Sequence, residues 1–259
     1  MTAADPILHA REQFPRGLQQ PEGSFRFSMD ALLLAAYARP AQNGPLLDLG
    51  CGCGVIGLAM LLAHPSLHAA GVDIALPLVE CSRQNAALLG LEKRFTAHHL
   101  DLRMLGKAEL PFAPEEFALV TANPPFRRCN QGRKPQGDMR QDALFETAGS
   151  LSDFVKAAGF ALKNQGSFYC IWSSERLAEL FCTLQAYRLE PKQLLPVQPK
   201  PEKECGLVLL RAVKNGKPGL KLEPPLLVYE TTPGAAPALT LEALQFCPWL
   251  ACNSKRSKD

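Results

Sequence analysis

The residues best suited to take part in a reaction are the four of the motif NPPF, which directly follows the apolar stretch 117–122. The side-chain oxygen of Asn123 and the carbonyl of Pro124 can each accept one N–H of a planar amino group. The lone pair of such a conjugated amine is delocalised, so these acceptors would direct it toward an electrophile. Pro125 stiffens the turn by fixing φ, and Phe126 offers an aromatic face for stacking. The motif therefore predicts a site that aligns a planar amine for nucleophilic attack.

A glycine-rich turn, "LLDLGCGCGVIGLAM", joins a predicted strand to a predicted helix. Gly50, Gly52 and Gly54 allow a sharp turn and a close approach to a ligand, and the helix N-terminus presents unpaired N–H groups. Read as G-x-G-x-x-G, ending at Gly57, the turn is also typical of dinucleotide sites. Asp48 argues against a pyrophosphate there, because a carboxylate repels phosphate and favours an ammonium group.

A second carboxylate, Asp73, ends the predicted strand "HAAGVDI" and is followed by Ile74. A carboxylate at this position is suited to accepting hydrogen bonds from ribose hydroxyls. NAD and other adenosyl ligands all carry ribose hydroxyls, so Asp73 indicates a ligand with a nucleoside but does not identify which one.

The cysteines give no sign of a disulfide framework or a metal centre. The nine cysteines are scattered, and several lie in apolar stretches where a reduced cysteine packs as a small hydrophobe. Cys51 and Cys53 form a C-x-C, but no second cluster completes four zinc ligands. We therefore expect no bound metal.

Positive charge is concentrated directly after NPPF. The whole chain has a formal net charge of +3, whereas residues 127–140 hold five basic side chains against Asp138 alone. The rest of the chain is therefore close to neutral, and this basic segment predicts contact with a polyanion such as RNA. A solvated loop of charges is the alternative. The five basic residues are Arg127, Arg128, Arg133, Lys134 and Arg140.

The composition is typical of a globular cytoplasmic protein. The chain has 259 residues, of which 47% are hydrophobic and 20% charged. Its longest apolar runs fall short of the roughly 20 residues of a membrane span, and the N-terminus lacks a basic segment followed by an apolar core. We expect no membrane association and favour a monomer.

The elements that must position these residues alternate along the chain. Predicted strands cover 45–50, 68–74, 93–101, 116–126 and 167–172, and predicted helices cover 28–38, 55–65, 77–90, 151–166 and 173–187. This alternation predicts an α/β fold with right-handed crossovers and a mainly parallel sheet covered on both faces. After Tyr187 the alternation stops, and the strand at 205–213 is expected to close the sheet in an antiparallel pair.

Three regions are expected along the chain. Scattered Pro and Gly predict turns or a short hairpin in residues 1–27. The alternating elements form one domain over 28–230, with Ser28 as the N-cap of its first helix. Residues 231–259 form an extension whose last six residues are expected to be mobile.

The segment "DLGCGCG" (48–54) resembles the signature of class I S-adenosylmethionine-dependent methyltransferases, and "HHLD", ending at Asp101, matches the acid that meets the cofactor's adenine amine in that family. The resemblance implies a Rossmann-like, doubly wound seven-stranded sheet with one antiparallel strand, and S-adenosylmethionine as cofactor. "NPPF" is similar to the motif of members that methylate adenine N6, guanine N2 or a protein glutamine amide. The residues implied at the cofactor are Asp48, Gly50, Cys51, Gly52, Gly54, Asp73, Ile74, Asp101, Leu102 and Asn123.

Segments outside this core, "GSFRFSMDALLLAAYA", the stretch after NPPF, and "PPLLVYE", resemble the bacterial tRNA1(Val) adenine-N6 methyltransferase family, a branch of the small-domain methyltransferases. The resemblance covers roughly 17–230. It implies that Phe27, Ser28 and Asp30 line the methionine side of the cofactor and that Arg140 lies in a loop over the substrate. This chain departs in two places: Phe126 replaces the commoner Tyr, and "MRQDAL" is a loose version of an Arg-His-Glu segment.

The leading hypothesis is an RNA adenine-N6 methyltransferase, with tRNA as the favoured substrate. A protein-glutamine enzyme keeps the chemistry, but such enzymes carry a helical recognition domain before the core, and only about two dozen residues precede Phe25 here. A guanine-N2 enzyme also fits the motif. A cofactor-dependent RNA-binding protein without turnover and an NAD-dependent oxidoreductase are more distant alternatives.

Overall fold

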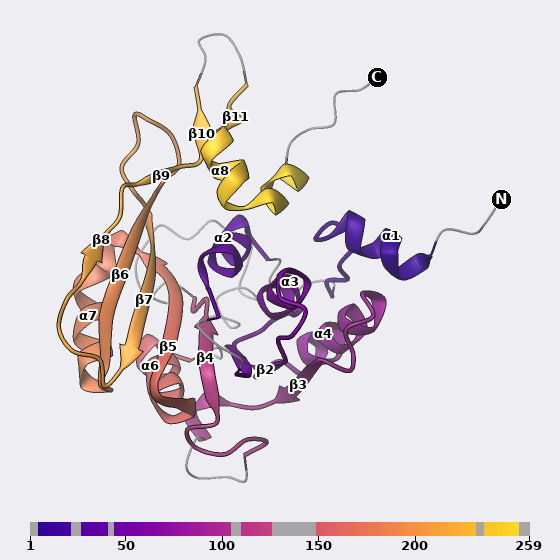
Figure 1. Ribbon diagram of the computed structural model, residues 1–259, viewed down its shortest axis with the longest axis horizontal. Helices are drawn as coiled ribbons and strands as arrows, with labels where there is room; N and C mark the ends of the chain where they lie inside the picture. Colours follow the sequence, from indigo (N-terminus) through magenta and orange to yellow (C-terminus); the bar gives the residue numbers. More distant parts are fainter. Residues whose placement is uncertain are drawn as a thin grey trace, which may run out of the picture.

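A computed structural model describes residues 5–21, 27–40, 44–104, 110–125, 149–231 and 236–253. Its centre is a sheet with the strand order β3-β2-β1-β4-β5-β7-β6-β8, and β9 also pairs with β6 (Figure 1). The strands are β1 (Leu46–Leu49), β2 (Ala69–Asp73), β3 (Phe95–His99), β4 (Phe117–Ala122), β5 (Leu162–Ser173), β6 (Leu189–Gln198), β7 (Leu207–Lys214), β8 (Lys221–Leu222) and β9 (Leu226–Leu227).

The pairing of the strands confirms the expected mixed sheet. Strands β3, β2, β1, β4 and β5 run parallel, whereas β7 is antiparallel to both β5 and β6. The expected seven strands with one antiparallel member are therefore present. Within the described residues the sheet is extended further by β8 and β9, each two residues long, which pair with β6 in parallel.

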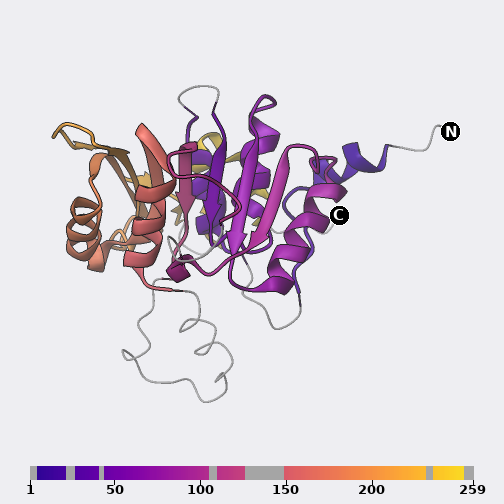
Figure 2. The same cartoon turned by 90° about the horizontal axis from the view of Figure 1, so that it is seen from below.

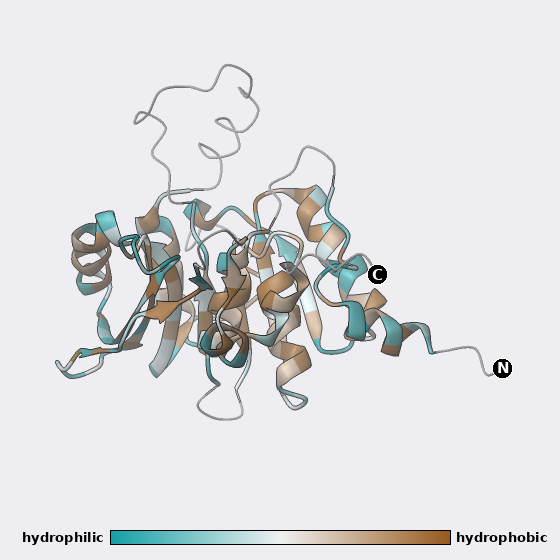
Figure 3. Cartoon of the chain, turned by 90° about the horizontal axis from the view of Figure 1, so that it is seen from above, coloured by the Kyte–Doolittle hydropathy of each residue, from teal (hydrophilic) through white to brown (hydrophobic). Residues whose placement is uncertain are grey.

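Helices cover both faces of the sheet, as Figure 2 shows. The buried side chains of α2 (Met29–Tyr37), α3 (Val55–Ala63) and α4 (Leu76–Leu88) belong to one hydrophobic cluster. Those of α6 (Leu151–Ala161) and α7 (Leu177–Ala186) belong to a second cluster. Successive strand residues alternate between the two, because side chains of a strand point to opposite faces. Apolar residues accordingly dominate the centre of the molecule (Figure 3).

Local sequence signals explain most helix boundaries. Helix α6 starts with a capping box between Ser150 and Asp153, and α4 is followed by Gly90 with φ of 62°. The expectation that α6 continues to residue 166 is wrong. Leu162 already pairs with Phe117 in the sheet, and Gln165 has φ of 62°, which no α-helix accommodates.

The N-terminal segment contains a helix where turns or a short hairpin were expected. Helix α1 (Pro6–Gln13) is capped by the side chain of Asp5, which accepts a hydrogen bond from Ile7 N at 3.0 Å, and Pro6 suits the first helical turn. A turn follows directly at residues 14–17. The expectation is thus wrong for α1 and correct for the turn that follows it.

The C-terminal segment packs onto the same core as α2. Strands β10 (Tyr229–Glu230) and β11 (Ala238–Leu239) form an antiparallel pair, followed by α8 (Leu241–Phe246) and the 3-10 helix η3 (Pro248–Asn253). Ala243, Cys247 and Leu250 are fully buried in the first cluster. The ring of Trp249 meets that of Phe14 edge-on at 5.7 Å, so the N- and C-terminal segments contact each other.

Two features are absent from the described residues. None of the helices is long and apolar enough to cross a membrane. No group of three or more His, Cys, Asp or Glu side chains in this part of the chain is arranged to hold a metal ion.

Candidate active site

The carboxyl ends of the four parallel strands β1, β2, β3 and β4 lie side by side, and we call this side of the sheet its carboxyl edge. Leu49 of β1 pairs with Ala122 of β4 and with Val72 of β2, and Asp73 pairs with His99 of β3. The chain leaves β1 toward β2 and β3 on one side, while β4 lies on the other side, so this edge contains a topological switch point. Open α/β sheets bind ligands at such points. The glycine turn, Asp73, Asp101 and Asn123 all follow these strand ends.

Asp48 lies under the glycine turn and is fully buried. The hydroxyl of Thr121, its cross-strand partner in β4, donates a hydrogen bond to Oδ1 over 2.9 Å. Oδ2 has no hydrogen-bond partner among the described residues. Burial raises the pKa of Asp48 to about 7, against the opposing effects of the Thr121 hydroxyl and the Gly57 backbone N–H. A buried, half-satisfied carboxyl group favours a nearby donor or positive charge.

The glycine turn has the left-handed backbone that its sequence predicts. The φ angles of Gly50, Gly52 and Gly54 are 67°, 55° and 87°. A Cβ atom at Gly52 would meet no other atom within 4 Å, so the backbone faces open space there. At Gly57 a Cβ atom would lie 2.8 Å from the ring of Phe95, so this glycine lets α3 pack closely on the sheet.

Asp73 closes the turn from the side of β2. Its Oδ2 accepts a hydrogen bond from Gly52 N at 2.8 Å, and its Oδ1 accepts one from Ala75 N at 2.9 Å. Each carboxylate oxygen can accept a second hydrogen bond, so two hydroxyl donors could still bind. Burial raises the pKa of Asp73, while these backbone hydrogen bonds oppose the rise. Ile74 contributes its carbonyl to a 2.8 Å contact with His99 Nε2.

The carboxylate of Asp101 is hydrogen-bonded to Arg103, two residues further along the chain. Arg103 donates to its carboxylate from Nε at 2.9 and 3.0 Å and from Nη2 at 2.7 Å. These bonds lower the pKa of Asp101, so the group stays ionised. An amine that bound here would share the carboxylate with Arg103. Leu102 starts the 3-10 helix η1 (Leu102–Met104) and is buried in the second cluster, which leaves its backbone rather than its side chain for a ligand.

The two thiols of the turn face the protein interior. Cys51 and Cys53 are only 3% and 4% exposed, and a Cβ atom at Gly71 would lie 2.7 Å from Cys51 Sγ. Burial raises the pKa of the Cys51 thiol well above its ordinary value. Cys51 N donates to Val72 O at 3.0 Å. Both residues therefore shape the turn through packing and backbone contacts.

The residues expected at the methionine side lie just before and within α2. Phe27 is half-buried against the first cluster, and its N–H donates to Gln20 Oε1 at 3.1 Å. Ser28 occupies the N-cap position, but its side chain makes no capping hydrogen bond, so the expected cap is only positional. Asp30 lies in the first turn, where burial raises its pKa against an opposing hydrogen bond with Ser28.

Asn123 follows the last residue of β4 and is half-buried, Pro124 is buried and Pro125 is half-buried. Among the described residues, none is hydrogen-bonded to the Asn123 side chain. The remaining predicted substrate residues lie outside the described part of the chain: Phe126, Arg127, Arg128, Arg133, Lys134 and Arg140.

Two residues at this edge were not identified from the sequence. Thr121 is fully buried and holds Asp48, and Asn85 in α4 is fully buried and hydrogen-bonded to the Cys53 carbonyl at 2.9 Å. A signal was present for each. Thr121 is a polar residue inside the apolar stretch 117–122, and Asn85 lies four residues after Cys81, on the apolar side of its helix.

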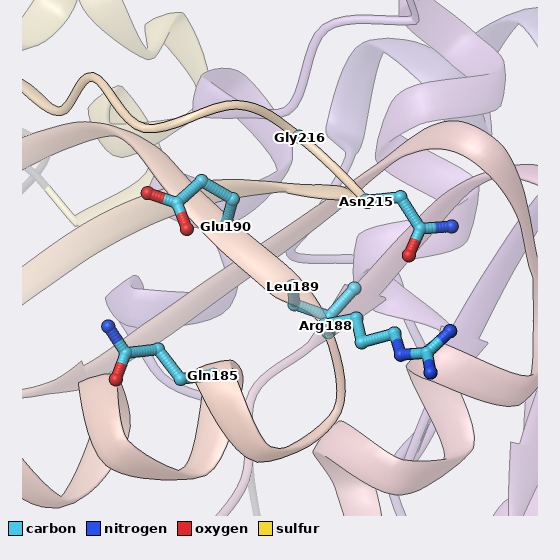
Figure 4. A pocket seen from close by; sticks show the side chains of 6 residues that line it. All are labelled: Gln185, Arg188, Leu189, Glu190, Asn215 and Gly216. Atoms are coloured by element: carbon cyan, nitrogen blue, oxygen red, sulfur yellow. The ribbon is translucent and has the colours of Figure 1, made fainter.

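A shallow pocket lies on the opposite side of the sheet, its amino edge, where the parallel strands begin (Figure 4). Leu189 opens β6, and its pairing partner Lys214 ends the antiparallel β7, which places this pocket at the amino ends of the parallel strands. None of the predicted site residues lines it. Its lining residues are Gln185, Arg188, Leu189, Glu190, Asn215 and Gly216.

Comparisons with known proteins agree with this arrangement. The family described as "Methyltransferase small domain" matches residues 28–181. A tRNA1(Val) (adenine(37)-N6)-methyltransferase of Porphyromonas gingivalis is 28% identical over 191 residues, covering 72% of this chain and 74% of the relative. A release factor glutamine methyltransferase of Neisseria gonorrhoeae is 32% identical over 123 residues, covering 48% of this chain and 41% of the relative.

The fold is also similar to a solved structure, that of a predicted O-methyltransferase, protein Atu636 of Agrobacterium tumefaciens. The TM-score is 0.69 and the identity 20%, over 85% of this chain and 96% of that one. At this identity the likeness concerns the fold alone. It confirms the expected architecture.

Proposed function

The chain belongs to the methyltransferase small domain family, and from this membership we propose that it transfers a methyl group from S-adenosylmethionine to N6 of an adenine in tRNA. The observation that carries the proposal is the position of Asn123. It follows β4 directly, and β4 is the neighbour of β1, which leads into the glycine turn. An amine acceptor and a nucleoside-binding turn thus share one edge of the sheet.

The residues at this edge fit an adenosyl cofactor that carries an ammonium group. Asp73 keeps an acceptor position on each oxygen for ribose hydroxyls, and the backbone at Gly52 borders open space. The unpartnered oxygen of Asp48 lies beneath the turn, where a bound ammonium group would favour the ionised form of this carboxyl group. Asp101 stays ionised and would accept from the adenine amine beside Arg103. When bound, S-adenosylmethionine supplies an electrophilic methyl group on a sulfonium centre.

The NPPF turn would hold the nucleophile. Asn123 Oδ1 and the Pro124 carbonyl accept the two N–H bonds of the substrate amine, which turns its lone pair away from the ring. Alignment and the redistribution of charge, rather than a strong base, lower the barrier. We further propose that Phe126 stacks on the flipped base and that the basic side chains between Arg127 and Arg140 contact RNA phosphates.

The identity of the substrate rests on the relatives. The Porphyromonas relative, named as an adenine-N6 enzyme of tRNA, matches 72% of this chain, and the basic segment suits a polyanion. A protein glutamine is the second candidate, because the Neisseria relative has the higher identity over its shorter match. The family match favours methyl transfer over NAD-dependent or non-catalytic alternatives. A cytoplasmic location and a monomeric state stay predictions.

The decisive experiment is mass spectrometry of nucleosides. Purified protein is incubated with S-adenosylmethionine and unmodified total tRNA, and the digested RNA is compared with a reaction that lacks protein. We expect N6-methyladenosine to increase. An increase in N2-methylguanosine instead, or methylation of a release factor but not of RNA, would reassign the substrate.

The control variant is Asn123→Ala, which removes one of the two amine acceptors. We expect the turnover rate to fall by about a hundredfold or more, because this contact acts on the reacting group. Cofactor affinity, measured by calorimetry, should stay unchanged. Full activity of the variant would disprove the role of Asn123 and leave the identity of the modified nucleoside as a separate result.

A further inference from the structure

Asn85 is a fully buried amide in the middle of α4, and its side chain joins two distant parts of the chain. Its Nδ2 donates to Cys53 O at 2.9 Å and to Gln19 O at 3.0 Å. Its Oδ1 accepts from Gln19 N at 2.8 Å. Both polar ends of the amide are therefore used, and within its own helix Nδ2 makes one long contact, to Cys81 Sγ at 3.7 Å. Such placement in a core costs desolvation unless every contact is made.

On one side of Asn85 lies the N-terminal arm, which we define as residues 5–21. The arm runs along α4 and is fixed at two points. Just beyond the end of α4, Arg11 Nε donates to Leu89 O at 2.8 Å. Near the middle of α4, Gln19 is held by Asn85 and by the Cys81 thiol, which donates to Gln19 O at 3.0 Å. The side chain of Gln20 then accepts the N–H of Phe27, directly before α2.

On the other side lies the glycine turn. The carbonyl that Asn85 binds belongs to Cys53, between Gly52 and Gly54. Gly52 is itself held by Asp73 at 2.8 Å. The turn is thus fixed from two directions, by a carboxylate at the edge of the sheet and by an amide from the helix beneath it. The open backbone of Gly52 lies between these two points.

We propose that Asn85 is a positioning residue of the cofactor site, which couples the docking of the N-terminal arm to the geometry of the glycine turn. This inference rests on the proposed function, because it takes the turn to be the S-adenosylmethionine site. Because one amide binds both segments, a ligand that orders the turn also stabilises the docked arm, and release of the arm loosens the turn. Asn85 acts through Cys53 and Gln19 and touches neither reactant.

The test uses the 259-residue chain and the variant Asn85→Leu, which keeps the approximate size of the side chain and removes the hydrogen bonds of its amide. We expect the Kd for S-adenosylmethionine, measured by calorimetry, to rise about tenfold, since one or two buried hydrogen bonds support the turn. Turnover at saturating cofactor should change by less than about threefold, because Asn85 does not touch the reacting groups. In the wild type, cofactor should slow hydrogen exchange at the Gln19 amide, and this effect should vanish in the variant.

Thr240→Ala is the control for a loss of stability alone. Thr240 caps α8, where its hydroxyl accepts from Ala243 N at 3.0 Å and donates to Leu227 O at 2.6 Å. This control should lose stability without a change in Kd or in the exchange of Gln19. If Asn85→Leu does not fold, Asn85→Asp replaces it, because aspartate keeps the acceptor for Gln19 N–H and loses the donated bonds.

The outcomes separate the two proposals. If the wild type binds S-adenosylmethionine and the Asn85 variants bind it equally well, Asn85 is a packing residue and the coupling is disproved. A raised Kd without any change in cofactor-dependent exchange at Gln19 overturns the role of the arm. If the wild type itself does not bind S-adenosylmethionine, the proposed function fails, and this inference fails with it.

Discussion

The two edges of the central sheet both contain left-handed backbone, but in the described chain only the amino edge has it in residues that carry side chains. At the carboxyl edge, the positive φ angles belong to the glycines of the turn after β1. At the amino edge, Gly90 and Gly219 are joined by residues that carry side chains, and the turns there bond to one another: Asn215 N donates to Arg188 O at 2.8 Å. The four non-glycine residues with positive φ in the described chain are Glu115, Gln165, Arg188 and Asn215.

This difference shows what distinguishes a candidate site from a tight turn. The amino edge has strained turns and a shallow pocket, yet its side chains bind neighbouring turns, as Gln165 Nε2 binds Asn215 O at 2.9 Å. The carboxyl edge leaves the backbone of Gly52 bare, beside the carboxylates of Asp48 and Asp73. A left-handed turn therefore indicates a ligand site only where the side chain is missing and complementary charge lies close by.

The largest effect in this comparison is expected from Gly52→Val. Valine is β-branched and disfavours φ of 55°, so we expect the free energy of unfolding to fall by about 1–3 kcal/mol. Its side chain would also enter the open space above the turn, so cofactor affinity should fall by more than about tenfold. Calorimetry and urea unfolding measure the two effects. Gly206→Val is the control, because Gly206 also faces open space but has no left-handed φ; equal losses in both variants would contradict the comparison.

A pH-dependent effect on stability alone is expected from the titration of Asp48. Burial raises its pKa in the folded state to about 7 from an ordinary value of 3.8. Between these values the folded state holds a proton that the unfolded state has lost, so stability should fall as pH rises through this window. Asp48→Asn does not titrate and should show a flatter curve, with the difference growing to a few kcal/mol by about pH 8. Urea unfolding from pH 4.5 to 8 measures it, and parallel curves for both proteins would exclude a buried carboxyl with a raised pKa.

The smallest effect is expected at the amino edge. Arg188→Gly relieves a φ of 59° at an exposed position, so stability should rise by about 0.5–1 kcal/mol. Cofactor affinity and methyl transfer should stay unchanged, because Arg188 lies at the opposite edge from the glycine turn. Thermal unfolding and a transfer assay measure both. A loss of transfer would show that the pocket at the amino edge takes part in function.

Much of the architecture was predictable because its signals are local. The alternation of apolar strands with helices, the glycine turn and the stop at Gly90 each depend on residues close together in the chain. The errors are also local in origin. The helix was extended to its apparent stop at Gly166, but the pairing of Leu162 with Phe117 ends it earlier, before the poor helix former Asn164. Helix α1 was missed because scattered Pro and Gly outweighed the capping signal of Asp5 and Pro6.

The partners of the site residues could not be predicted in the same way. The bond between Thr121 and Asp48 joins residues 73 positions apart, and that between Asn85 and Gln19 joins residues 66 positions apart. Both depend on sheet register and on the packing of α4, which periodicity does not specify. The Arg103–Asp101 ion pair, by contrast, spans two residues and was open to prediction from the sequence.

The sequence by itself determined which chemical groups stand at which strand ends: glycines and Asp48 around β1, Asp73 after β2, Asp101 after β3 and Asn123 after β4. Only the tertiary structure decided how each group is used. It buries Asp48 with one oxygen unpartnered, pairs Asp101 with Arg103 and turns the Cys51 thiol inward. The physical reason is that residue type and order are properties of the chain, whereas burial, register and hydrogen-bond partners exist only once distant segments have packed together.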